Sequence, residues 1–313
     1  MKNIFLGIVF IGFQFTFGQQ IKLNEYDVKT NSKDFNLNGN IKQVTSTAKD
    51  ANGNYATIPF LENEFYNQIV LEFNSKGNLI KRTNNLDYRG KIGVYSFTEY
   101  QYNSSQLPTE IKTTVLNNGE DPKRVSSLKK YTYNSNNQIN DFQETVKSKT
   151  SSTAYQTLFK YSNRLENVQN KVDGTTSGEV KYTYNKAGKL IKQETIGFDG
   201  KSGLKKYFIY DRATPIYEEV NNNGNKQMTF INQHNSVSKF QQFDQNQNLK
   251  LELNFDQTNN VTEAKVQTFQ AGKPVLNTYQ IKYNYDSKNN WTTANVYTKG
   301  DLKYMVTREI SYQ

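Results

Sequence analysis

A seven-residue frame recurs along the chain and constrains its fold more than any other feature of the sequence. In "YNKAGKL", residues 184 to 190, an aromatic residue precedes Asn185, and Gly188 and Leu190 follow at the fifth and seventh positions. A fixed spacing that returns many times indicates a repeat architecture, which decides the fold before local propensities do.

The frame occurs nine times, beginning at Phe35, Phe73, Tyr133, Tyr184, Tyr210, Ile231, Phe243, Phe255 and Tyr285. The second position is always Asn or Asp, the seventh is always apolar, and the fifth is Gly or Asn in seven of the nine copies. Two copies, Tyr102 to Leu107 and Tyr161 to Leu165, look contracted. The positions that we expect to form the turns and their packing include Asn36, Gly39, Ile41, Asn74, Gly77, Leu79, Asn134, Asn137, Ile139, Tyr184, Asn185, Gly188, Leu190, Tyr210, Asp211, Asp256, Asn259, Tyr285, Asp286, Asn289 and Trp291.

Each position of the frame has a role in a β-hairpin. An Asn or Asp side chain starts a type I turn by accepting a hydrogen bond from the backbone two residues on. A Gly or Asn three residues later takes the left-handed conformation that closes a three-residue loop with a bulge. The first and seventh residues then become cross-strand neighbours, which predicts that Tyr184 lies against Leu190 and Tyr285 against Trp291.

The segments between the frames alternate apolar and polar residues, as at Tyr182, Thr183 and Tyr184, and they end in further turns such as Asp173-Gly174. This period of two predicts strands with one face toward a core and one toward water. The sequence therefore predicts an all-β protein, a repetitive antiparallel hairpin meander of roughly twenty strands in a curled or spiral open sheet. Propeller-like or barrel closure remains open as an alternative.

The pattern Tyr-x-Tyr-Asn-x-x-Gly-x-Leu at residues 182–190 resembles the YD repeat of the Rhs family, and literal Tyr-Asp pairs occur at Tyr210-Asp211 and Tyr285-Asp286. The resemblance extends over nearly the whole chain after its first 18 residues. It implies β-sheet ribbons that curl into a shell or spiral, which in some members enclose toxins or bind carbohydrate. This chain is short and lacks the Asp-Pro-containing core that follows the repeats of toxin-carrying members, so the resemblance implies a fold rather than toxin enclosure.

Residues 1–18 have one lysine, a short apolar stretch and a small residue before Gln19, which indicates a signal peptide. We expect residues 19–313 to form a single β-repeat domain outside the cytoplasm, either periplasmic, associated with the outer surface or secreted. No later apolar run is long enough to predict a membrane span. The chain has no cysteine, so stability cannot come from disulfides.

An atypical insert at about residues 51–68 interrupts the repeat and contains "YATIPFLENEFYNQ" at 55–68. Its apolar and aromatic residues suit a segment that caps the terminal repeats, or a loop that contacts a ligand. The sequence does not decide between these two roles.

Residues suited to catalysis or metal binding are few. His234 is the only histidine, and it lies in a turn, where we expect a solvated side chain rather than a catalytic base. "DQNQNL" at 244–249 resembles the start of a calcium loop, but Leu249 and Phe255 replace the glycine and glutamate that such a loop needs. We therefore expect neither a metal nor a cofactor, and no Gly-rich nucleotide-binding pattern occurs.

Two further features have ordinary structural interpretations. Trp291 occupies the apolar position of a frame, which favours core packing over stacking on a ligand. The carboxylate pairs Glu62/Glu64 and Glu218/Glu219 are available for glycoside hydrolysis, but nothing in the sequence singles them out.

The formal net charge of +10 is spread along the chain, as on a solvated surface, so we do not expect nucleic acid as a partner. The sequence favours a secreted or envelope-associated, non-enzymatic scaffold that binds carbohydrate or protein surfaces. The alternatives are an outer-membrane β-barrel and a hydrolase built on the repeat scaffold.

Overall fold

The computed structural model describes residues 30–116, 125–148, 151–209, 216–220, 224–232, 236–270 and 273–313. Within these ranges it contains a 3₁₀ helix, η1, and twenty β-strands. Their bounds are η1 Ser32–Phe35, β1 Ile41–Asp50, β2 Gln68–Phe73, β3 Leu79–Tyr88, β4 Lys91–Tyr102, β5 Pro108–Val115, β6 Val125–Tyr133, β7 Ile139–Lys147, β8 Ser152–Tyr161, β9 Leu165–Val172, β10 Thr175–Tyr184, β11 Leu190–Gly197, β12 Ser202–Ile209, β13 Ile216–Val220, β14 Lys226–Ile231, β15 Val237–Phe243, β16 Leu249–Phe255, β17 Val261–Gln270, β18 Lys273–Tyr285, β19 Trp291–Thr298 and β20 Asp301–Tyr312. No helix in these ranges has the length and apolar character needed to cross a membrane.

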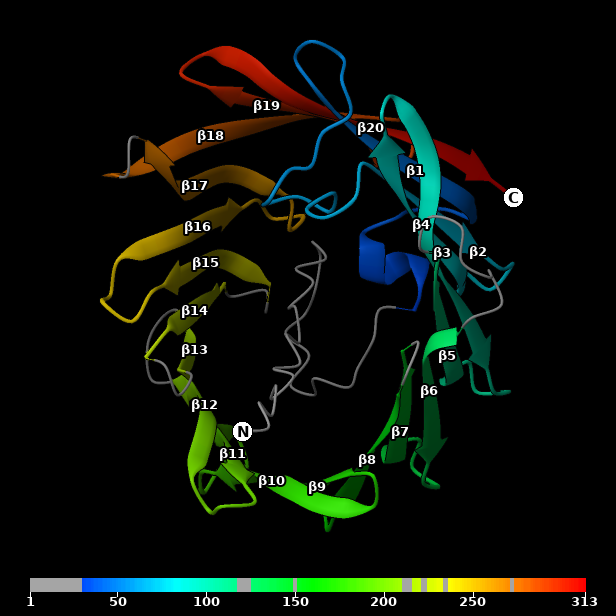
Figure 1. Ribbon diagram of the computed structural model, residues 1–313, viewed down its shortest axis with the longest axis vertical. Coiled ribbons are helices and arrows are strands. Elements are labelled where there is room, and N and C mark those ends of the chain that lie inside the picture. Colours follow the sequence, from blue (N-terminus) through cyan, green and yellow to red (C-terminus); the bar gives the residue numbers. More distant parts are fainter. Residues whose placement is uncertain are drawn as a thin grey trace.

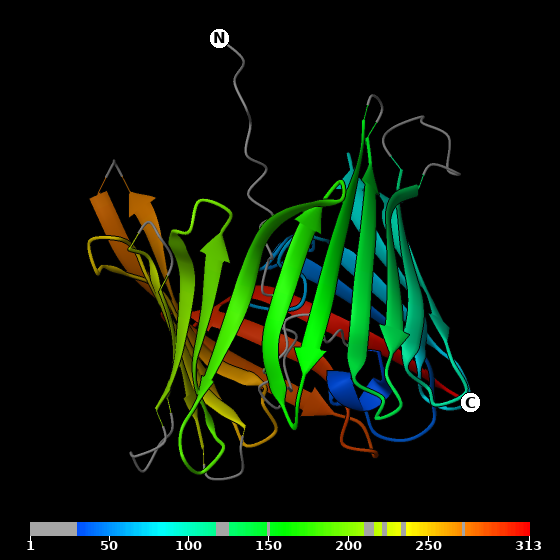
Figure 2. The same ribbon diagram turned by 90° about the horizontal axis from the view of Figure 1, so that it is seen from below.

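The strands form one antiparallel meander that curls into a ring (Figure 1). Each strand pairs with the next along the chain, and β20 also pairs with β1, from Ile41 opposite Tyr312 to Asp50 opposite Tyr304. Viewed from the side, the strands stand next to one another and are tilted (Figure 2). The expected all-β, repetitive antiparallel meander of roughly twenty strands is confirmed. The sequence favoured an open sheet and gave closure as the alternative, and the pairing of β20 with β1 joins the two ends of the meander.

The frame forms the hairpin turns that its spacing predicts. Tyr184 lies opposite Leu190 and Tyr285 opposite Trp291, and the register shifts by one residue just before each of these pairs. Such a shift is the bulge expected of a three-residue loop closed by a left-handed residue. The first and seventh residues are therefore cross-strand neighbours.

The second residue of the frame holds the turn by accepting backbone hydrogen bonds. Oδ1 of Asp286 accepts from the backbone N–H groups of Lys288 and Asn290, at 2.9 Å each. Oδ1 of Asn185 accepts from Lys189 at 2.9 Å. The fifth residue has a positive φ in six of these turns, namely at Gly77, Asn137, Gly188, Gln247, Asn259 and Asn289. The left-handed position is thus occupied even where the residue is glutamine.

The copy that begins at Phe35 differs from the prediction, because it is not a hairpin turn. Residues Ser32–Phe35 form η1, and Asn36 itself is left-handed, with φ 54°, and ends that helix. A capping box between Asn31 and Asp34 satisfies backbone donors at the start of η1. This local hydrogen bonding favours a helical turn at Asn36, where the frame predicted the start of a type I turn.

The copy that begins at Tyr102 is full-length, not contracted as the sequence suggested. Tyr102 pairs with Pro108, Gln106 takes the left-handed position with φ 63°, and Oδ1 of Asn103 accepts from the N–H of Leu107 at 3.0 Å. This copy was not recognised in the sequence because glutamine occupies its fifth position and proline its seventh. The copy at Tyr161 is shorter, since Tyr161 pairs directly with Leu165.

Some sequence predictions fall outside the described residues. These are the signal peptide 1–18, the Tyr210-Asp211 pair and His234.

Tyrosine hydroxyl groups connect neighbouring hairpins, a role that the sequence did not suggest. In four hairpins the hydroxyl donates to the backbone carbonyl of the residue that ends the preceding frame. The pairs are Tyr102 to Leu79 at 2.6 Å, Tyr133 to Pro108 at 2.6 Å, Tyr184 to Leu165 at 2.6 Å and Tyr283 to Val261 at 2.9 Å. Each of these tyrosines thus belongs to one hairpin and donates a hydrogen bond to the turn of the preceding one, so it connects the two turns.

The insert between β1 and β2 lies on the inner side of the ring, beside β16 to β19 (Figure 1). Its residues Ile58, Phe60 and Leu61 are buried in a core cluster with side chains from β15 to β20, including Ile281 and Val306. The Phe60 ring lies 5.0 Å from the ring of Tyr279. The insert thus supplies a second apolar layer over this part of the sheet.

The opposite face of the same strands carries a cluster of paired polar side chains, as well as the exposed Phe269 and Leu276. Leu253 belongs to the inner cluster, so its neighbour Glu252 faces outward. Oε1 of Glu252 accepts from Nζ of Lys265 at 2.7 Å, and Oε2 accepts from Nε2 of Gln241 at 2.6 Å.

Gln247 offers a direct test of the left-handed turn position. Its φ is 62°, which is strained for a residue with a Cβ. We expect Gln247→Gly to stabilise the protein by up to about 1 kcal/mol, because glycine takes this conformation without strain. This relief should outweigh the larger conformational entropy that glycine gives to the unfolded chain. Chemical denaturation of the purified chain measures the effect.

The matched control is Asn246→Gly in the same exposed turn, where φ is not positive. Glycine there only adds freedom to the unfolded chain, so stability should fall by up to about 1 kcal/mol. Equal effects of the two substitutions would contradict the assignment of the left-handed position.

Candidate functional site

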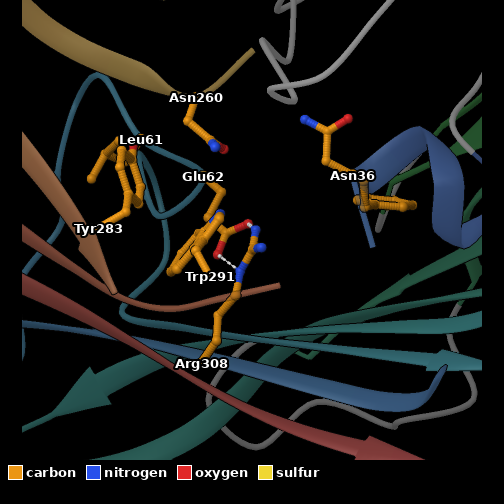
Figure 3. Close-up of a pocket in the computed structure, with 8 residues that line it drawn as sticks. Asn36, Leu61, Glu62, Asn260, Tyr283, Trp291 and Arg308 are labelled. Atoms are coloured by element: carbon orange, nitrogen blue, oxygen red, sulfur yellow. Dashed lines mark hydrogen bonds and ion pairs between the residues drawn. The ribbon is translucent and has the colours of Figure 1, made fainter. Parts of the chain in front are cut away.

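A pocket lies where the insert, η1 and the last hairpins of the ring meet (Figure 3). It is lined by Phe35, Asn36, Leu61, Glu62, Asn260, Tyr283, Trp291 and Arg308. These residues come from segments far apart in the sequence, so the pocket exists only because the ring brings the ends of the meander together.

Strand pairing places Arg308 at the base of the pocket. Arg308 lies on β20 opposite Ser46 of β1, and the neighbouring strand β19 begins at Trp291. The guanidinium carbon of Arg308 lies 3.4 Å from the centre of the Trp291 ring. A guanidinium stacked on an indole in a buried position is a favourable cation–π contact that also fixes the orientation of the arginine.

Glu62 of the insert pairs with this arginine through two hydrogen bonds. Nε of Arg308 donates to Oε1 at 3.1 Å and Nη2 donates to Oε2 at 2.5 Å. The side chains are only 7% and 14% exposed, respectively for Arg308 and Glu62. Two parallel bonds of this kind hold the insert against β20 in one orientation.

The carboxyl group of Glu62 stays ionised in this setting. Burial by itself raises the pKa of Glu62, but the charge and hydrogen bonds of Arg308 outweigh burial and hold the pKa below its ordinary value. A hydrogen bond with Ser46 lowers it further. The pocket therefore contains a neutral pair of opposite charges rather than a net charge.

One nitrogen of the Arg308 guanidinium has no partner in the described part of the chain. Its Nη1 is buried and has no hydrogen-bond partner among the described residues. A buried, charged N–H without an acceptor is unfavourable, so this atom marks a place where an oxygen would be stabilised.

Two asparagine side chains stand above the ion pair on either side of the pocket (Figure 3). Nδ2 of Asn36 donates to the carbonyl of Thr258 at 2.7 Å, and Nδ2 of Asn260 donates to the hydroxyl of Thr258 at 2.7 Å. The first bond holds the end of η1 to the turn between β16 and β17, and the second lies within that turn. The amide oxygens of Asn36 and Asn260 take no part in these bonds.

The part of the chain that the structure describes contains no group of three or more histidine, cysteine, aspartate or glutamate side chains that could hold a metal. Enclosed space in the pocket is about 10 Å³. That is roughly enough for one water molecule or one oxygen-sized group.

The predictions made from the sequence were correct for some of these residues and incomplete for others. Trp291 packs in the core cluster as predicted and is 8% exposed, but it also lines the pocket and stacks on Arg308. Glu62 and Glu64 do not act as a pair, because Glu62 is committed to Arg308, whereas burial raises the pKa of Glu64. The side chains of Glu218 and Glu219 are outside the description.

Arg308 was missed altogether. Glu62 could have indicated it, because a carboxylate inside an apolar segment is buried only when a cation pairs with it. Nothing in the repeat indicates which of the chain's 39 lysines and arginines supplies it.

No protein-family model and no curated protein matches the chain. Among solved structures it is similar to a porin-like protein from Bacteroides uniformis, at 9% identity and TM-score 0.37, over 88% of this chain and 98% of that one. A porin-like protein from Bacteroides vulgatus matches at 12% identity and TM-score 0.24, over 87% and 98% of the two chains.

A TcdB2-TccC3 structure matches at 10% identity and TM-score 0.29, over 76% of this chain and 15% of that one. The chain thus spans a small part of that protein. At such low identities and TM-scores, these similarities carry no conclusion about function.

Removing one partner of the buried ion pair tests its role. We expect Glu62→Leu and Arg308→Met to lower the free energy of unfolding by about 3 to 5 kcal/mol each, because each leaves a buried charge unpaired. The double variant should recover most of this loss, since it leaves no charge. Denaturant unfolding at pH 7 measures the cycle, and strictly additive losses would contradict a direct pairing.

The same pair predicts a pH dependence. Because the folded-state pKa of Glu62 lies below the ordinary value of 4.5, its stabilisation is present above about pH 4.5 and is lost as the pH falls through the folded-state pKa. The stability difference between the original chain and Glu62→Leu should therefore shrink in acid. A difference that stays constant down to acid pH would show that the ionised carboxylate is not the cause.

Proposed function

We propose that the chain is an extracytoplasmic, non-enzymatic repeat scaffold that binds carbohydrate at the Arg308 pocket. The observation that carries this proposal is the unpaired Nη1 of Arg308 beside the Trp291 ring, below the amides of Asn36 and Asn260. Aromatic side chains together with a few fixed polar groups are typical of pockets that orient small ligands.

A binding role is favoured over hydrolysis by the carboxylates. Glycoside hydrolysis requires two carboxyl groups on either side of the scissile bond, one of them protonated. Glu62 is the sole carboxylate among the residues that line the pocket, and its lowered pKa and its bonds to Arg308 make it a poor proton donor.

The extracytoplasmic location is supported by the signal-peptide features of residues 1–18. Cell fractionation tests it. We expect the processed chain, beginning at Gln19, in the periplasmic or extracellular fraction, and an unprocessed chain in the cytoplasm would contradict the proposal.

Carbohydrate binding is tested with a glycan array probed by the processed chain. We expect Asn36→Ala combined with Asn260→Ala to weaken binding to the recognised glycan by about tenfold or more, because each lost hydrogen bond contributes roughly 0.5 to 1.5 kcal/mol. Asn136→Ala is the matched control, since Asn136 lies in the exposed turn between β6 and β7 and bonds through its backbone N–H.

Binding to no glycan would contradict the proposed function. Equal loss in the Asn136→Ala control would show that the effect does not arise at the pocket. Release of reducing sugar from a bound glycan would contradict the non-enzymatic role.

A further inference from the structure

We propose that the Arg308 pocket accepts a single uncharged hydroxyl group of a neutral sugar and discriminates against acidic sugars. This inference rests on the proposed carbohydrate ligand and specifies its chemical class. It runs against the simplest expectation from the net charge of +10, which would favour acidic polysaccharides.

The first step concerns the number of groups that the pocket can hold. Nη1 of Arg308 is buried without a hydrogen-bond partner among the described residues, and the pocket that Arg308 lines encloses about 10 Å³. That space admits one oxygen-sized group. The rest of a sugar ring would lie above it, between the amides of Asn36 and Asn260, whose oxygens can accept hydrogen bonds from sugar hydroxyl groups.

The second step concerns charge. Two of the guanidinium donors of Arg308 are already bonded to the Glu62 carboxylate, which is ionised. An incoming carboxylate or sulfate would be attracted by Arg308 and repelled by Glu62 at similar range, and it would also lose its hydration. A hydroxyl oxygen gains the hydrogen bond from Nη1 without that repulsion.

The third step concerns the aromatic ring. Trp291 contacts Arg308 and lines the pocket, so one edge of the ligand would approach the indole. Trp291 is the only tryptophan in the chain. Its fluorescence therefore reports on this pocket and on no other surface.

The experiment titrates the processed chain with matched methyl glycosides and follows Trp291 fluorescence. The pairs are glucose with glucuronic acid, galactose with galacturonic acid, and mannose with mannuronic acid, which differ only in a hydroxymethyl or a carboxylate group. At about 150 mM salt, where long-range attraction is screened, we expect at least one neutral sugar to give a saturable change. Its acidic counterpart should bind at least tenfold more weakly.

A charge variant separates this mechanism from a merely structural role. Glu62→Gln keeps a polar partner for Arg308 but removes the repelling charge, so the preference for the neutral sugar should fall to less than threefold. Its unfolding midpoint is measured first. If this variant does not fold, Asn36→Ala replaces it, and it should weaken neutral and acidic sugars by the same factor, preserving the preference.

Each alternative result would overturn the inference in a recognisable way. Equal or tighter binding of the acidic sugar at Trp291 would refute the charge argument while leaving carbohydrate binding intact. Glycan binding on the array without any change in Trp291 fluorescence would place the ligand elsewhere. A crystal grown with the neutral sugar that shows only a water molecule at Nη1 would refute the inference as well, whereas binding to no glycan at all would also refute the proposed function.

Discussion

Most of the described hairpin turns of the repeat depend on one acceptor, the Asn or Asp side chain at the second position. Oδ1 of Asp286 receives the N–H groups of Lys288 and Asn290, and the same geometry recurs at Asn74. Because these bonds fix the loop length, they fix the register of the strands that follow. The inner and outer faces of the ring are therefore decided at the turns, one hairpin at a time.

A sheet of this length also needs its inner face covered and its ends joined. The insert covers the inner face of β15 to β20 with Ile58, Phe60 and Leu61, and the ion pair from Glu62 to Arg308 holds it in place. At the end of β20, the hydroxyl of Tyr312 donates to Asp286 and also accepts from Nδ2 of Asn290. Pairing of β20 with β1 removes the exposed edges that a free meander would present. The candidate site lies next to the pairing of β20 with β1.

Much of the fold could be predicted from the sequence because its determinants are local. The partners of Tyr184 and Tyr285 followed from a spacing of six residues, and the left-handed position followed from Gly and Asn. Prediction failed where a residue's local chemistry competes with the frame, as at Asn36, or where an unusual residue takes a standard position, as at Gln106.

The site could not be predicted in the same way, because it depends on contacts between residues far apart in the sequence. Arg308 and Glu62 are 246 positions apart in the sequence, and they come into contact only because β20 pairs with β1. No spacing rule connects an insert near one end of the repeat with a strand at the other. Trp291 was assigned correctly to the core, yet its contact with Arg308 required the register of β19 and β20.

The pairing of β20 with β1 brings the residues of the site together. Hydrogen–deuterium exchange of the native chain measures it most directly. We predict that the backbone amides of β20 that face β1, from Tyr304 to Tyr312, exchange as slowly as those between β10 and β11. Rapid exchange along β1 and β20, with protection elsewhere in the sheet, would show two free edges and would contradict both the ring and the site.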